Sequence, residues 1–201
     1  MTAAIDPAPA PPARGEADEQ LLHAVRRADW RFLLPEPHLG RVVYPGPHEP
    51  ELVRALELVS AQLELTGPRG LQASDADVVV VSGGGARVAA RLSTGVRPGG
   101  WLYAEVRGAA GPRLAAGLRD QGFEEVEVVW LWPDATRVKE MVVLGDGAAV
   151  RHALGRRDAG ARLRPRAWAA RILLATGRLH LLVPSVAVIG RRVGGKGSER
   201  A

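Results

Sequence analysis

The sequence predicts a three-layer α/β fold built on a mostly parallel sheet, and three observations support this. Residues 77–81 read Asp-Val-Val-Val-Val, a continuous β-branched run typical of a strand covered on both faces. Strand-like and helix-like segments alternate along the chain, which is typical of helices lying on both faces of a sheet. No clean helix separates two of the late strand-like segments, which favours an antiparallel final strand.

In the first half of the chain, proline and glycine mark where each predicted element ends. In order, the elements are a helix over 21–27, an apolar segment over 30–35, a strand over 41–44, a helix over 52–59 and a strand over 63–66. Pro45-Gly46-Pro47 ends the first strand. Pro50 suits the first turn of the helix that follows, because its missing N–H is not needed there.

The second half begins with the clearest strand and becomes less regular towards its end. In order, the elements are a strand over 77–81, helix 86–92, strand 101–106, helix 112–120, strand 123–132, strand 141–144, helix 148–154, helix 164–176 and strand 179–189. Gly83-Gly84-Gly85 ends the first of these strands, and Arg97-Pro98-Gly99-Gly100 is predicted to be a turn before the next. Gly177 is the expected cap of the last helix.

Composition suggests one folded domain between two polar tails. Residues 1–19 are rich in proline and alanine without apolar periodicity and are predicted to be disordered, as are residues 193–201. The domain is therefore expected over residues 20–192. No run of about 18 apolar residues predicts a membrane span, and residues 1–14 lack the features of a signal peptide. We expect a cytoplasmic protein with no membrane partner.

Several kinds of chemistry lack a starting residue. The chain has no cysteine, and its five histidines show no zinc-ligand spacing, so no metal site is predicted. Neither a GxSxG elbow nor a phosphate-binding GxxxxGK[ST] loop is present. The net charge of +5 comes almost wholly from arginine, as in proteins from high-GC genomes. Specific nucleic-acid binding is therefore not predicted from charge alone.

Four phrases of the sequence resemble class I S-adenosylmethionine-dependent methyltransferases. Ala76 to Ser82 resembles that family's fourth strand, and Arg97 to Glu105, beginning Arg-Pro-Gly-Gly, resembles the turn and fifth strand. Gly122-Phe123 resembles the entry to the sixth strand, and Leu182 to Arg191 resembles the closing strand. The match covers roughly residues 41–192. It implies a Rossmann-like, methyltransferase-like sheet and S-adenosylmethionine as the cofactor.

The cofactor half departs from this family in three ways. Active members have a glycine-rich turn after the first strand, whereas residues 44–50 here keep only Gly46 among three prolines, which have no N–H to donate. Glu64 is the one candidate for the acid that grips the cofactor ribose, with an ordinary solvated charge as the favoured alternative. Only residues 44–77 lie between Val43 and Val78, too few for a complete nucleotide half, so the fold is expected to be truncated there.

The resemblance implies four low-specificity cofactor contacts, at Gly46, Glu64, Ser82 and Gly83. Gly83 opens a glycine triplet, which is more often simply a loop. Trp130 and Trp132 are two residues apart and so share one face of a strand. They are candidates for the floor of a substrate pocket, with a core or interface stripe as an equally strong interpretation. No catalytic residue stands out.

A basic stretch runs from Arg151 to Arg171. It could meet an acidic partner or a phosphate-bearing ligand, but a solvated helical face is the favoured interpretation.

Three functions stay open. The first is a methyltransferase-like pseudoenzyme, an accessory or small-molecule-binding protein of bacterial, secondary biosynthesis. The second is an active methyltransferase acting on a small molecule. The third is a subunit of a homo- or hetero-oligomer that binds a protein partner. A scaffold repurposed for another reaction, such as cyclisation, would leave no signature in this sequence.

Overall fold

The computed structural model describes residues 21–22, 24–67, 75–157 and 179–194. Most predicted elements are present. The strands are β1 (Leu39–Pro45), β2 (Ser60–Thr66), β3 (Ala76–Val81), β4 (Val96–Arg107), β5 (Phe123–Trp132), β6 (Glu140–Val143) and β7 (Ser185–Arg192). The α-helices are α2 (Pro50–Val59), α3 (Gly85–Leu92), α4 (Gly111–Asp120) and α5 (Gly147–Arg157). Short 3-10 helices are η1 (Asp29–Leu33), η2 (Ser93–Gly95), η3 (Gly108–Ala110) and η5 (Leu179–Leu181).

The seven strands form one sheet in the order β2-β1-β3-β4-β7-β5-β6. β2, β1, β3 and β4 pair in parallel. β7 is antiparallel to both β4 and β5, so β5 runs in the same direction as the parallel strands. β6 returns antiparallel along β5. The prediction of a mostly parallel sheet with an antiparallel final strand is confirmed.

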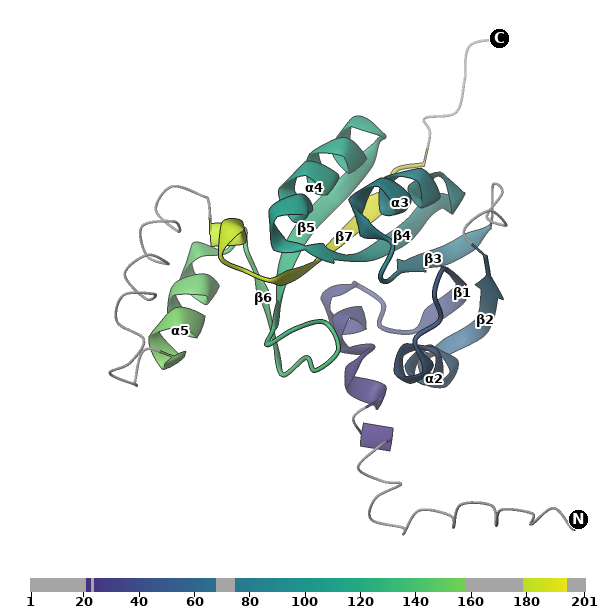
Figure 1. Ribbon diagram of the computed structural model, residues 1–201. Coiled ribbons are helices and arrows are strands. Elements are labelled where there is room, and N and C mark those ends of the chain that lie inside the picture. The colour runs from purple at the N-terminus through teal and green to yellow at the C-terminus, as the bar shows by residue number, and fades with distance from the viewer. Residues whose placement is uncertain (1–20, 23, 68–74, 158–178, 195–201) are drawn as a thin grey trace, which may run out of the picture.

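Helices cover both faces of the sheet (Figure 1). One hydrophobic core lies between the sheet and α3, α4 and α5, and a second lies between the sheet, α2 and η1. β3 supplies both cores because its valines alternate: Val79 and Val81 belong to the first, and Val78 and Val80 to the second. This explains why the strand shows no polar alternation in the sequence.

The chain reverses its direction of travel across the sheet between β1 and β3. From β1 it passes through α2 to β2 on one side, whereas from β3 it passes through α3 to β4 on the other. α2 and α3 lie on opposite faces, as right-handed crossovers in opposite directions require. Such a reversal leaves a crevice at the carboxyl ends of the two central strands.

The sheet is truncated at the β2 edge, as the sequence predicted. β2 ends at Thr66 and β3 begins at Ala76, and β3 pairs with β1 rather than with β2. β2 is therefore an edge strand, and no further strand or helix of the described chain follows it on that side.

Two predicted boundaries were wrong. The Arg97-Pro98-Gly99-Gly100 segment belongs to β4 rather than to a turn before it, since the pairing jumps from Ala76↔Val96 to Val78↔Trp101 and the extra residues bulge out of the strand. The last strand begins at Ser185, because residues 179–181 form η5. The helix predicted over residues 164–176 lies outside the described residues.

Candidate functional site

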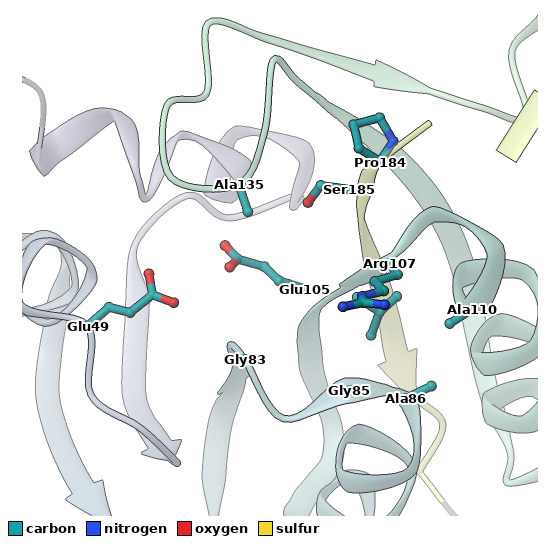
Figure 2. Close-up of a pocket in the computed structure, with 11 residues that line it drawn as sticks. Glu49, Gly83, Gly85, Ala86, Glu105, Arg107, Ala110, Ala135, Pro184 and Ser185 are labelled. Carbon is teal, nitrogen blue, oxygen red and sulfur yellow. The ribbon is translucent and has the colours of Figure 1, made fainter. Parts of the chain in front are cut away.

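An open cavity of about 410 Å³ lies in the crevice where the strand order reverses (Figure 2). Its walls come from the carboxyl ends of β3 and β4, the start of α2, the start of β7 and the loop after β5. The lining residues are Glu49, Gly83, Gly85, Ala86, Glu105, Val106, Arg107, Ala110, Ala135, Pro184 and Ser185. Open α/β sheets bind ligands at this place, where the strand order reverses.

Arg27, from the segment before η1, joins two of the acidic groups at this cavity. Its side chain is only 2% exposed. The guanidinium lies 2.7 Å from the Glu49 carboxylate and 2.9 Å from the Glu105 carboxylate, and it also donates to the carbonyl oxygen of Ala135. Arg27 therefore ties together the start of α2, the end of β4 and the loop after β5.

Glu105 is the most deeply buried acid of the site. Burial raises the pKa of its carboxyl, and the Arg27 guanidinium and the Tyr103 hydroxyl offset this only in part. Tyr103 Oη donates to Glu105 over 2.8 Å, and the Tyr103 ring stacks on Trp30 with centroids 4.2 Å apart. Desolvation opposes the charge of Arg27, but the combined effect of Glu105, Tyr103 and Glu49 outweighs it. The pKa of Arg27 is therefore raised, and Arg27 remains a cation.

The turn after β1 offers few hydrogen-bond donors to a ligand. Three prolines, at positions 45, 47 and 50, have no N–H. The amide of Gly46 donates to the carbonyl oxygen of Thr66 over 3.2 Å. The amide of Glu49 donates to the Tyr44 hydroxyl over 3.3 Å, and that hydroxyl donates to the carbonyl oxygen of Pro47 over 2.7 Å. These two amides and this hydroxyl are therefore used in hydrogen bonds within the protein.

The sheet now identifies the fold. Five strands, β2, β1, β3, β4 and β5, run in one direction, and β7 lies antiparallel between β4 and β5. This arrangement, with the crevice where the strand order reverses, agrees with the architecture that the sequence phrases implied. The chain has a class I methyltransferase-like fold. The truncated edge at β2 is where it departs from a complete one.

Solved methyltransferase structures resemble this chain distantly. One from Archaeoglobus fulgidus has 10% identity and a TM-score of 0.46, covering 89% of this chain and 99% of its own. A possible histamine N-methyltransferase from Thermotoga maritima has 12% identity and a TM-score of 0.41, covering 89% and 95%. One from Geobacter sulfurreducens, solved with S-adenosyl-L-homocysteine, has 16% identity and a TM-score of 0.33, covering 86% and 89%. Similarity of this size transfers no activity, cofactor or substrate.

Neither a protein-family model nor a curated protein matches the chain.

The residues of this methyltransferase-like fold do not fit a glycine-rich cradle for S-adenosylmethionine. A cradle needs free amides and close backbone approach after the first strand. Here the amides of Gly46 and Glu49 are both used within the protein, and prolines flank them. The Glu49 carboxylate at the start of α2 lines the cavity, but it already accepts hydrogen bonds from Arg27 and Ser82.

The four predicted cofactor contacts are only partly brought together. Gly83 lines the cavity. Ser82 is buried and its hydroxyl donates to Glu49, which lines the cavity. Gly46 is close to Ser82, since a Cβ on Gly46 would lie 3.7 Å from the Ser82 carbonyl oxygen. Glu64 lies apart in β2, where its carboxylate is 2.7 Å from the Arg41 guanidinium, and it does not line the cavity. Whether any of them contacts a cofactor stays a prediction.

The two tryptophans of β5 do not line the cavity. Trp130 is buried and Trp132 partly buried in the core shared with α3, α4 and α5, and neither lines the cavity. Of the basic stretch, Arg151 and Arg156 are exposed on α5, and Arg156 pairs with Glu140 of β6. Residues 158–171 of that stretch lie outside the described residues.

Sequence reasoning missed the charged residues that shape the cavity: Arg27, Glu49, Glu105 and Arg107. For Glu105 and Arg107, the pattern of the strand offered a signal. Tyr103, Glu105 and Arg107 alternate at the end of an apolar strand, which places them on one face at the carboxyl edge of the sheet. For the described residues, no group of three or more potential metal ligands is present, and no helix is long and apolar enough to cross a bilayer.

Proposed function

We propose that this protein binds a small molecule in the cavity at the carboxyl ends of β3 and β4, and that it does not transfer methyl groups. It would then serve as an accessory or binding protein in a bacterial, secondary biosynthetic pathway. The observation that carries the proposal is the buried bridge from Arg27 to Glu49 and Glu105. It holds the start of α2 by side-chain contacts at the place where a methyl donor would need a free turn.

The cavity itself supports small-molecule binding. Its volume of about 410 Å³ lies within the range of ligand pockets, and alanine, valine and proline side chains line much of it. Polar groups enter at defined points, from Glu49, Glu105, Arg107 and Ser185. An apolar cavity with a few convergent polar groups is the usual form of a small-molecule site.

Calorimetric titration of the full chain with S-adenosylmethionine and with S-adenosyl-L-homocysteine tests the proposal. We expect no saturable heat with either compound up to millimolar concentration. Saturable binding in the micromolar range would overturn it. The Glu49→Gln variant is the matched control. Binding that depends on the start of α2 would have a changed affinity in this variant, whereas non-specific attraction of a cationic compound to the surface would remain.

An active methyltransferase is the second candidate, and one observation favours it. Two carboxylates, of Glu49 and Glu105, lie beside the cavity and would attract a ligand that carries positive charge, as S-adenosylmethionine does. Transfer of label from the methyl-labelled cofactor to a small-molecule acceptor would establish this function. Lack of transfer together with lack of binding would exclude it.

A further inference from the structure

The charges around the cavity are not balanced in the same way at its two ends. At one end, the Glu49 and Glu105 carboxylates share the Arg27 guanidinium, and hydroxyl groups also donate to them. At the other end lies Arg107, which is exposed. Within the described part of the chain, Arg107 makes no ion pair and no side-chain hydrogen bond. Among the charged residues of the lining, Arg107 is therefore the one that has no partner in the described residues.

Strand pairing places a hydroxyl beside this arginine. Arg107 and Ser185 are direct partners in the antiparallel β4–β7 ladder, so their side chains lie next to each other on one face. Glu105, two residues before Arg107, shares that face. Figure 2 shows the Arg107 side chain between Ser185 and the Gly85–Ala86 turn.

The opposite wall is backbone rather than side chain. Gly83 and Gly85 have φ of +69° and +70°, a backbone conformation that residues other than glycine rarely adopt. A Cβ on Gly85 would meet no atom within 4 Å, so open space lies above it. The first amides of α3 follow, and the first amides of a helix have no intrahelical acceptor. An anion between Arg107 and this turn would meet donors on both sides.

We infer that the ligand of this cavity carries an anionic group, a carboxylate or a phosphate, which Arg107 and Ser185 receive. The inference rests on the proposed small-molecule function and names the class of its ligand. The planar guanidinium donates two parallel hydrogen bonds to either group, and the Ser185 hydroxyl donates a third. The carboxylates at the far end, already neutralised in part by Arg27, keep the anionic group at the Arg107 end.

Titration of the ¹⁵N-labelled full chain with sodium phosphate, and separately with sodium acetate, tests this by NMR at constant ionic strength. We expect saturable shifts of the Gly83 and Gly85 amides and of the Arg107 Nε–H. Substituting Arg107→Ala should weaken the affinity at the two glycines at least tenfold. Arg54→Ala, which removes an exposed arginine from α2 outside the cavity, should leave it unchanged. The tighter of the two anions identifies the group.

Two results would overturn the inference. One is the absence of saturable shifts in the unmodified protein with both anions. The other is an equal loss of affinity in the Arg107→Ala and Arg54→Ala variants, which would mean general charge attraction. Neither result bears on the cofactor titration, so failure of the anionic site and failure of the non-methylating function are separately visible.

Discussion

Removing Arg27 should destabilise the fold far more than removing an exposed arginine. The Arg27 and Glu105 side chains are 2% and 6% exposed, so an Arg27→Met variant leaves Glu105 buried without its counter-charge. Loss of one partner of a buried pair costs about 3–5 kcal/mol. That is a large part of the roughly 5–15 kcal/mol by which single domains are stable.

A second substitution separates lost charge balance from lost packing. In the double variant Arg27→Met with Glu105→Gln, no unpaired charge remains, and the glutamine can still accept from Tyr103. Replacing both partners of a buried pair is often close to neutral. We therefore expect the double variant to recover more than half of the stability that the single Arg27→Met variant loses.

Urea denaturation followed by tryptophan fluorescence measures these differences, with unchanged m-values as the condition for comparing them. The control is Arg41→Met, because its ion pair with Glu64 is exposed and its loss should hardly move the midpoint. The single Arg27→Met variant should also recover stability in acid, where Glu105 takes up a proton. A loss below about 1 kcal/mol for Arg27→Met, or a double variant no more stable than the single one, would refute the reasoning.

Three further outcomes are expected. Trp30→Ala should cost about 3–5 kcal/mol because the ring is 1% exposed, whereas Phe32→Ala, at a side chain 61% exposed, should have little effect in the same urea titration. Gly108→Ala should destabilise strongly, since its Cβ would overlap carbonyl oxygens of residues 180 and 183, but Gly117→Ala, in a helix with free space, should stabilise by about 0.5–1 kcal/mol in thermal unfolding. Glu105→Gln should remove a dependence of the free energy of unfolding on pH. Because the pKa of Glu105 is raised in the folded state, its contribution to stability is fully present below the ordinary value of 4.5 and is lost as the pH rises through the folded-state pKa. Equal slopes of stability against pH in both proteins would contradict this.

A helix or strand could be predicted from the sequence where its own residues indicate its type. β3 has a β-branched run long enough to fill both cores, and Pro50 and the apolar face of α2 mark a helix without reference to the rest of the chain. The last strand was placed too early because Leu179 to Leu182 is as apolar as a strand. The two leucines at its end are 56% and 50% exposed, so they turn outward instead of joining the sheet.

The charged site could not be predicted in the same way, because its partners are distant in the chain. Arg27 and Glu105 are 78 residues apart, and the sequence places Arg27 beside Arg26, an ordinary exposed neighbour. A local signal was nevertheless present. Ala24, Arg27 and Ala28 are buried at helical spacing, so Arg27 lies on the inward face while Arg26 points to solvent. A charge on an apolar helical face predicts a buried partner.

The position of Arg27 also bears on which ligands the cavity selects. Two carboxylates at the carboxyl edge of the sheet would favour a cationic compound if they were free. Arg27 satisfies them from within the protein, at 2.7 and 2.9 Å, so a cationic ligand would have to compete with a guanidinium that is already desolvated. Arg107 faces no such competitor among the residues that the structure describes. On the function proposed above, the electrostatic preference of the site would thereby shift from the cationic methyl donor towards an anionic molecule, while the fold keeps its crevice.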